Sequence, residues 1–367
     1  TINVNQRVTG TNIAEGTYVT AITGGYGSVT SFVISQATTN DSGGSLAGQT
    51  LTFYQTNADD CVAVGLNALA SITTGSTNVA VGNYAGTALT TGFKNVFVGY
   101  GAGKAANDDS YSVAIGYDAL VTDAASSGSI AIGYQALEDQ NTASSNNVAI
   151  GFQAAKNLDG GTDSVYVGFL AGGVGAITGG FNTCMGYSAG YALAGGASNV
   201  LIGKNAGVAI TDGQRNIAIG HSALAAANLG ESYNVAIGHG AMESETSGAD
   251  YCVAVGYAAL NLQDENVKNT AIGGLAGDSI EEGDGNTLLG YQAGAAIVGG
   301  DNNTAVGDQA FYGGTGSSNT MVGSDTGQTA TGNDNVCVGS SAGLVLGDGP
   351  GNVLIGRAAG AAMTVGD

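Results

Sequence analysis

A five-residue phrase, Asn-Val-Ala-Ile-Gly and its variants, sets three mostly apolar residues between a usually polar residue and a glycine, and it recurs along most of the chain. It occurs eighteen times after residue 60, at intervals of 16 to 18 residues. Its closing glycines are Gly65, Gly82, Gly99, Gly116, Gly133, Gly151, Gly168, Gly186, Gly203, Gly220, Gly238, Gly256, Gly273, Gly290, Gly307, Gly323, Gly339 and Gly356. Short alternation bounded by glycine predicts a strand. The near-constant interval predicts small units stacked as a parallel β-solenoid of about eighteen coils.

The strand expected in each unit is apolar on both faces. The second residue of the phrase is Val or Ile in thirteen copies and Thr in five, and the fourth is aliphatic or Met185. Because residues two apart point the same way, these two columns are expected to line the inside of the coil. The third residue points oppositely and is nevertheless apolar in all eighteen copies.

The column of third residues is therefore predicted to need a partner. A strand that is apolar on both faces is typically buried on both, and this column is longer than a chance exposed patch. Its linear form predicts parallel copies of the chain around a shared axis, as a cyclic homo-oligomer. Replacing Ala149 and Ala236 with Asp is expected to separate those copies. The predicted seam consists of Ala63, Ala80, Phe97, Ala114, Ala131, Ala149, Tyr166, Cys184, Leu201, Ala218, Ala236, Ala254, Ala271, Leu288, Ala305, Met321, Cys337 and Leu354.

The rest of each unit is predicted to form corners and turns. Alanine stands three residues after the glycine in seventeen copies, with Thr326 as the exception, which indicates a tight corner. The thirteen asparagines that open the phrase, from Asn78 to Asn352, are expected to form a hydrogen-bonded ladder. The remaining length leaves room for one short second strand per coil. Stacked at about 4.8 Å, eighteen coils would give a rod of about 85 Å.

Residues 1–60 break the repeat and are predicted to be a separate N-terminal β module. Strand-like alternation covers residues 17–22, 28–35 and 49–55, with a glycine-rich turn at residues 24–27. We expect a small antiparallel sheet that caps the first coil. The shaft of repeats then comprises residues 61–367.

The amino-acid composition argues against several classes of protein and of function. Hydrophobic residues make up 43% of the chain and charged residues only 10%, which is the reverse of a disordered protein. The net charge is −21, and eight scattered basic residues cannot form a patch for nucleic acid or for anionic membranes. Cys61, Cys184, Cys252 and Cys337 lie many repeats apart and are interpreted as small buried hydrophobes, with contact between symmetry-related chains as the alternative.

Few residues in the sequence are candidates for catalysis or for binding a ligand or metal. An aromatic residue often follows the phrase glycine, as in Tyr100 and Phe152, and is interpreted as a packing column, with sugar stacking as the alternative. His221 and His239 share this position in neighbouring repeats and are weak metal candidates if the column faces an oligomer axis. Acidic pairs such as Asp108-Asp109 are interpreted as solvated turns, and no carboxylate pair indicates hydrolysis. We therefore expect no enzyme activity and no cofactor.

The sequence of the repeat resembles repeats found in two known protein families. Asn147-Val-Ala-Ile-Gly151 is similar to the head repeat of trimeric autotransporter adhesins, which fold as left-handed parallel β-rolls of three chains. Asn286-Thr-Leu-Leu-Gly-Tyr-Gln-Ala-Gly294 resembles repeats of phage tail fibres that precede an intramolecular chaperone domain. The stretch from Val8 to Ile22 is similar to β modules of virion appendage proteins. The adhesin heads repeat about every fourteen residues, so the tail fibres are the nearer match.

These resemblances imply a left-handed homotrimeric β-roll that forms a rigid segment of a viral tail fibre for host attachment. It would lie in the virion, with other tail components and a host surface glycan or receptor as further partners. The alternatives are a bacterial surface adhesin head and an extracellular filament subunit, located outside the cell or on its surface.

Overall fold

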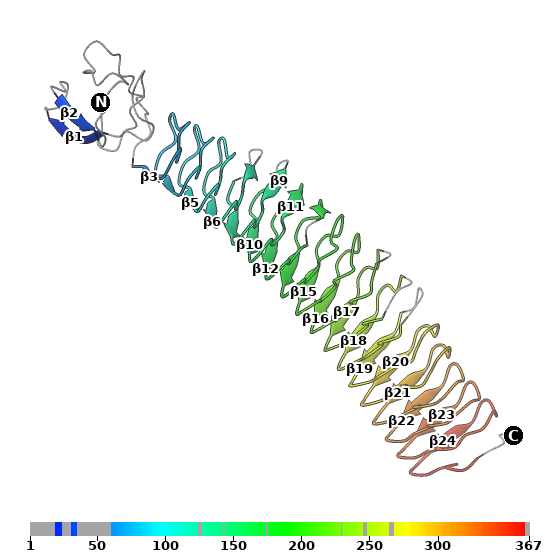
Figure 1. Ribbon diagram of the computed structural model, residues 1–367. Coiled ribbons are helices and arrows are strands. Elements are labelled where there is room, and N and C mark those ends of the chain that lie inside the picture. Colours follow the sequence, from blue (N-terminus) through cyan, green and yellow to red (C-terminus); the bar gives the residue numbers. More distant parts are fainter. Residues whose placement is uncertain are drawn as a thin grey trace.

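The computed structural model describes residues 19–23, 31–34, 60–123, 127–141, 144–173, 175–228, 230–244, 248–263 and 268–363. All of the regular secondary structure in these segments is β-strand. None of them contains a helix that could cross a membrane. From residue 60 onward the chain forms one elongated parallel β-solenoid with about 17 residues per turn (Figure 1). The predicted all-β solenoid is therefore confirmed.

The main sheet runs along the whole solenoid and takes one three-residue strand from each copy of the repeat. Neighbouring strands are parallel and pair like positions, so Ala149 lies opposite Ala131 on one side and Tyr166 on the other. The stack is open, with β3 and β24 at opposite ends (Figure 1). The strands are β3 (Val62–Val64), β4 (Val79–Val81), β5 (Val96–Val98), β6 (Val113–Ile115), β8 (Ile130–Ile132), β10 (Val148–Ile150), β12 (Val165–Val167), β14 (Thr183–Met185), β15 (Val200–Ile202), β16 (Ile217–Ile219), β17 (Val235–Ile237), β18 (Val253–Val255), β19 (Thr270–Ile272), β20 (Thr287–Leu289), β21 (Thr304–Val306), β22 (Thr320–Val322), β23 (Val336–Val338) and β24 (Val353–Ile355).

A second, smaller sheet occupies part of the opposite wall. It consists of β7 (Thr122–Asp123), β9 (Asp139–Asn141), β11 (Asn157–Asp159) and β13 (Ala176–Ile177), in that order and all parallel. Within the described residues the predicted second strand forms in these four coils alone, and the other coils close through turns.

The N-terminal region contributes one hairpin to the described residues. Strands β1 (Val19–Thr23) and β2 (Ser31–Ile34) pair antiparallel and overlap the two stretches, residues 17–22 and 28–35, where the sequence predicts strands. The third predicted strand, at residues 49–55, and the proposed capping of the first coil lie outside the described residues.

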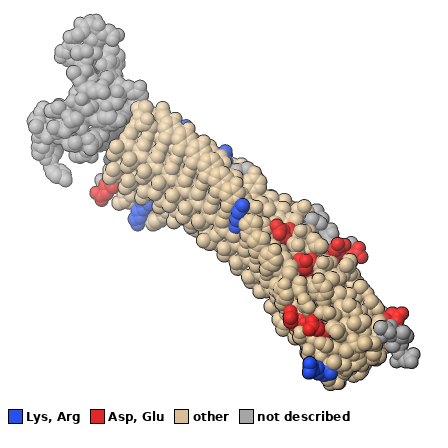
Figure 2. Space-filling view, turned by 60° about the horizontal axis from the view of Figure 1, so that its bottom comes forward, with Lys and Arg blue, Asp and Glu red and all other residues tan. Residues whose placement is uncertain are grey.

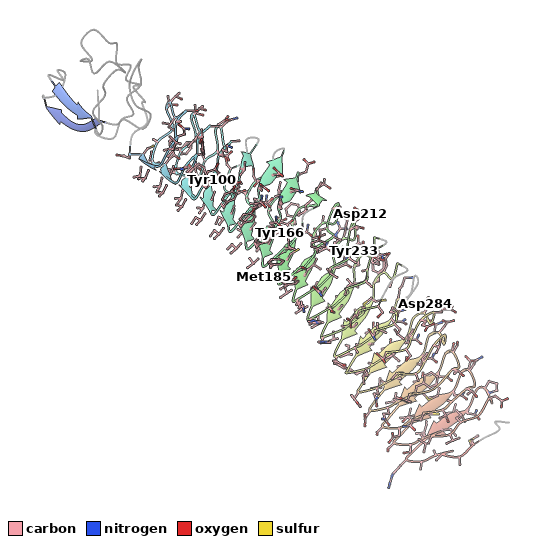
Figure 3. The ribbon with its side chains drawn as sticks, viewed as in Figure 1. Tyr100, Tyr166, Met185, Asp212, Tyr233 and Asp284 are labelled. Carbon is pink, nitrogen blue, oxygen red and sulfur yellow. The ribbon has the colours of Figure 1, made fainter. Side chains whose placement is uncertain are left out.

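The core of the solenoid is lined by the third residue of each phrase. Sixteen of the eighteen third residues are fully buried within their own chain, whereas the second and fourth residues are half-buried or exposed. The exceptions are Ala63 and Leu354, in the first and last coils. The predicted assignment of faces is therefore wrong, and the other sixteen residues of the predicted seam are interior residues. In Figure 3, Tyr166 lies within the coil and Met185 lies on its outer side.

The interior is narrow, which explains why alanine and not valine faces inward. Counting from the residue that opens the phrase, the third and ninth residues of a coil occupy the same volume. Where the third residue is alanine, the ninth is large in most coils, as in Ala114 with Leu120. Where the third residue is large, the ninth is always glycine. The eight such pairs are Phe97 with Gly103, Tyr166 with Gly172, Cys184 with Gly190, Leu201 with Gly207, Leu288 with Gly294, Met321 with Gly327, Cys337 with Gly343 and Leu354 with Gly360.

The glycine that closes each phrase is required by the backbone. Gly151 has φ 141°, a conformation that L side chains rarely adopt. A Cβ placed on it would lie 2.7 Å from the carbonyl carbon of Gly168 in the next coil. Successive coils thus approach through their glycine backbones, which fixes the close spacing of the stack.

The phrase asparagines form the expected ladder along a buried corner. The backbone N–H of Asn199 donates to Oδ1 of Asn182 at 3.0 Å, and Asn199 Oδ1 accepts from the N–H of Asn216 at 2.9 Å. The Asn199 side-chain amide also donates to the carbonyl of Gly213 at 2.8 Å. The alanine at the predicted tight corner is buried in every coil except the first and the last, and the exception Thr326 donates its hydroxyl to the carbonyl of Gly339 at 2.8 Å.

Candidate functional site

The surface with the most distinctive composition is the outer side of the main sheet. It consists of three parallel columns, formed by the second, fourth and sixth residues of every repeat, and we call it the outer face. In the coil of β10 these residues are Val148, Ile150 and Phe152. The strand alternation that buries Ala149 turns its two neighbours outward. The outer face therefore extends along all eighteen strands.

Large apolar side chains on the outer face are partly open to solvent. The exposed fraction is 36% for Ile150, 40% for Met185 and 46% for Leu289, because the stacked neighbours in adjacent coils cover the rest. The second and fourth columns contain no charged residue, and the sixth contains only Lys204, Asp308 and Arg357. Figure 2 shows a long surface of uncharged residues, with acidic residues gathered toward the C-terminal half.

Aromatic residues fill the sixth column over six consecutive coils. Their rings stack nearly parallel, with centroids 5.0 to 5.3 Å apart. The residues are Tyr100, Tyr117, Tyr134, Phe152, Phe169 and Tyr187, and we call them the aromatic block. Because each ring covers part of the face of the next, the block presents edges more than open faces. This geometry favours the predicted packing column over a platform for sugar rings.

The two histidines continue the sixth column. His221 and His239 are exposed and stack at 4.8 Å, and His239 stacks in turn on Tyr257 at 5.6 Å. No group of three or more His, Cys, Asp or Glu residues within the described segments could hold a metal ion. Within one chain the pair is therefore part of the stacked column.

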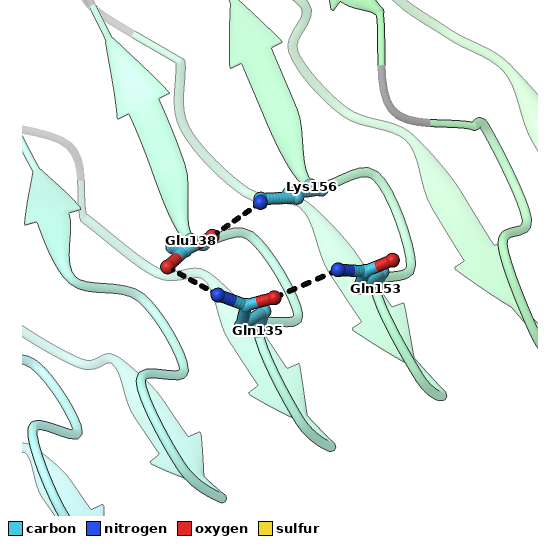
Figure 4. A network of polar contacts seen from close by, with 4 residues as sticks. All are labelled: Gln135, Glu138, Gln153 and Lys156. Atoms are coloured by element: carbon cyan, nitrogen blue, oxygen red, sulfur yellow. Dashed lines mark hydrogen bonds and ion pairs between the residues drawn. The ribbon is translucent and has the colours of Figure 1, made fainter.

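A polar network borders the aromatic block in the coils of β8 and β10 (Figure 4). Lys156 Nζ lies 2.9 Å from Glu138 Oε2, and Gln135 donates to Glu138 Oε1 at 2.7 Å. Gln153 donates to Gln135 Oε1 at 2.7 Å. The network links neighbouring coils and neutralises one acidic side chain beside the outer face.

Two ionisable residues lie in the interior of neighbouring coils. Burial raises the pKa of the Tyr166 phenol and of the Cys184 thiol well above their ordinary ranges. Both side chains are fully buried third residues and stay neutral in the folded chain. Cys252 and Cys337 are also buried, as the interpretation as small buried hydrophobes predicts, whereas Cys61 in the first coil is half-buried. The acidic residue Asp109 is also fully buried, so its interpretation as part of a solvated turn is wrong.

Sequence reasoning missed the outer face because it assigned the bulkier aliphatic columns to the core. A signal for the correct assignment was present. Every third residue larger than alanine is followed six residues later by glycine, which indicates that the two positions touch inside the coil. The second and fourth residues show no such compensation.

Comparison with protein-family models and with curated proteins found no match for this chain.

Proposed function

We propose that this chain is a rigid, non-enzymatic structural segment of a viral tail fibre, in which parallel copies assemble as a homotrimer. The observation that carries the proposal is the outer face, which is almost free of charge along the whole solenoid and apolar over most of it. An exposed apolar surface of this extent is typical of a protein–protein interface. In an assembled fibre it would be covered by the other copies.

The interior supports a mechanical role. Backbone hydrogen bonds join each coil to the next along the main sheet, and the buried asparagine ladder adds a second line of bonds at the corner. The fully buried core packs small and large side chains in close contact. A rod of this kind holds its two ends at a fixed distance, which suits an element that carries an attachment module away from a particle.

The oligomer proposed here uses a different surface from the one that the sequence pattern first suggested. The interior third residues are unavailable to another chain, so the seam moves to the second, fourth and sixth columns. Three copies around one axis would each turn this face inward, toward the axis and the neighbouring copies. Trimeric state and left-handed coiling follow from the resemblance to tail fibres and to autotransporter heads.

The second candidate is a bacterial surface adhesin head or an extracellular filament subunit that binds a host surface or glycans. The resemblance of Asn147-Val-Ala-Ile-Gly151 to adhesin head repeats favours it. The stacking of the aromatic block leaves it without an open platform for sugars, which favours the structural role.

Immunogold electron microscopy with antibodies against the chain tests the proposal, on virions and on cells from the same source. We expect gold particles on fibres that project from virions. Labelling confined to the cell envelope would contradict the tail-fibre role and support the adhesin alternative.

A further inference from the structure

We propose that a gap in the sixth column of the outer face, at Gly274, binds one ring of a neutral hexopyranose glycan. Gly274 is the only glycine among the eighteen sixth residues, and tyrosines occupy the coils on either side of it, as Tyr257 and Tyr291. We call this position the Gly274 gap. The structural role proposed above needs no ligand, so this site goes beyond that role and names a class of partner for the segment.

The stacked column opens at the Gly274 gap. Successive rings of the aromatic block lie within 11° of parallel, whereas Tyr257 is tilted by 29° against His239. Among the described residues, a Cβ added to Gly274 would meet Tyr291 alone, with Cδ2 at 3.5 Å and Cε2 at 3.8 Å. Both distances are ordinary van der Waals contacts. The space that a side chain fills in the neighbouring coils is therefore open here.

The two tyrosines beside the gap are the most exposed tyrosine or phenylalanine residues of the column. The exposed fraction is 60% for Tyr257 and 53% for Tyr291, compared with 41% for Phe152, which stacks on a ring on each side. Tyr257 has this exposure although His239 covers one of its faces. The column thus offers open aromatic surface at the gap, in contrast to the aromatic block.

The gap has the thickness of one ring. Tyr257 and Tyr291 are two coils apart, which at about 4.8 Å per coil separates their positions by about 9.6 Å. A ring inserted midway would lie about 5 Å from each tyrosine, which is close to the spacing of the rings in the aromatic block. A hexopyranose ring suits this spacing, because the C–H groups on its two faces make it thicker than a planar ring. Such C–H groups pack on the negative faces of aromatic rings.

The strand surface beside the gap combines apolar and hydroxyl groups. In the coil of the gap the outward residues of the strand are Thr270 and Ile272, and in the next coil they are Thr287 and Leu289. A glycan that extends from the gap across the sheet would place C–H faces on Ile272 and Leu289. Its hydroxyl groups would then reach the two threonines. The surroundings therefore suit a ligand that is apolar on its faces and polar at its edges, as a saccharide is.

Charge favours a neutral glycan. Asp308 follows Tyr291 in the sixth column, and the net charge of the chain is −21. A carboxylate accepts hydrogen bonds from sugar hydroxyls but repels acidic sugars. If an aromatic side chain of a protein partner filled the gap, these polar groups would be desolvated without hydrogen bonds. They also make this stretch of the outer face a poor surface for apolar contact, so we expect the gap to stay accessible in the proposed assembly.

Two substitutions of Gly274 test the site in the full chain. Gly274→Tyr completes the column, and the backbone accepts it because Gly274 has no positive φ and tyrosine is the sixth residue in six other coils. Gly274→Ala is the matched control, because its methyl group makes only ordinary contact with Tyr291 and leaves the gap open. Tyr291→Ala removes one wall of the gap, and Tyr134→Ala removes a ring from the aromatic block.

An array of immobilised oligosaccharides supplies the probes, with neutral hexose and N-acetylhexosamine chains beside sialylated and sulphated ones. We expect the wild type to bind neutral chains, and calorimetric titration with the best of them gives the dissociation constant of each variant. This constant should stay within about threefold of wild type for Gly274→Ala and Tyr134→Ala. It should rise about tenfold or more for Gly274→Tyr and Tyr291→Ala.

An array on which the wild type binds no neutral chain would overturn the inference, and so would unchanged affinity in Gly274→Tyr. A weaker oligomer in Gly274→Tyr, with no saccharide bound by the wild type, would overturn it too and would assign the gap to contact between copies. Immunogold labelling of virions is independent of these results. Failure of the glycan site can therefore be distinguished from failure of the fibre role.

Discussion

Inside each coil, the third and ninth residues share one volume, and Phe97 with Gly103 shows the relation most clearly. A Cβ on Gly103 would lie 2.6 Å from the Phe97 ring, with no other side chain among its nearest neighbours. In the next coil the sizes are reversed, with the small residue Ala114 at the third position and the large residue Leu120 at the ninth. Leu120 has φ 54° and Gly103 has φ 60°, so the backbone at this position already accepts leucine.

A double variant that places the small residue at position 97 and the large residue at position 103 should therefore fold with nearly the stability of the wild type. We expect Phe97→Ala to lower the free energy of unfolding by about 3–5 kcal/mol through a cavity. Gly103→Leu alone should cost about 1–3 kcal/mol through overpacking. The double variant should recover most of both losses, with a coupling energy of about 2 kcal/mol or more. Thermal unfolding of the four proteins provides the measurement. Strictly additive losses would show that the two positions do not share a volume.

Tyr166 makes the stability of the chain depend on pH in the alkaline range. Burial raises its pKa, so the folded chain keeps the phenol proton that the unfolded chain loses near pH 10. The unfolded state then binds fewer protons, and stability falls as the pH rises above about 10, by up to about 1.4 kcal/mol per pH unit. The full contribution is present below that pH.

The variant Tyr166→Phe isolates this effect, and Phe97 shows that phenylalanine fits a third position. We expect wild type and Tyr166→Phe to differ little at pH 8 and to diverge above pH 10, with the variant the more stable. Buried Cys184 contributes equally to both proteins and cancels in the comparison. Urea unfolding at each pH supplies the curves. Parallel curves across the range would indicate that the phenol titrates normally in the folded chain.

At the scale of one element, the buried corner depends on the asparagine ladder. Removing the Asn199 side chain leaves the N–H of Asn216 and the carbonyl of Gly213 without this partner in a buried position. We expect Asn199→Ala to cost about 2–4 kcal/mol, at about 1–2 kcal/mol for each orphaned group. Asn199→Ser should cost less, since Ser164 already accepts from the N–H of Asn182 at 3.0 Å.

Hydrogen exchange measures this directly at the amide of Asn216. Its protection should decrease in the order asparagine, serine, alanine at position 199. Equal protection in all three proteins would mean that the ladder does not hold the corner.

The strands and corners could be predicted from the sequence because each depends on a local and repeated requirement. Gly151 marks the close approach of two backbones, and the phrase asparagines mark a buried polar corner. The direction of each strand face could not be read from hydrophobicity alone. Val148 and Ala149 are both apolar, and the choice between them depends on the width of the coil, which is a tertiary property. The size relation between third and ninth residues carried that information.

At the scale of the whole molecule, the chain folds as a single-chain solenoid, and we propose that its copies associate through the outer face. Neighbouring positions in one strand should then respond to the same substitution in different ways. Ile150 and Ile237 belong to the outer face, and Ala149 and Ala236 are fully buried beside them. The same charge should separate copies at the first pair and disrupt the coil at the second.

Sedimentation of three full-length proteins tests this claim most directly. Wild type should sediment as an elongated particle of three times the 35.7 kDa of one chain. Ile150→Asp with Ile237→Asp should yield a monomer with an unchanged circular dichroism spectrum, and Ala149→Asp with Ala236→Asp should lose the β-sheet spectrum. A folded monomer from the alanine pair, together with an unchanged oligomer from the isoleucine pair, would contradict the account.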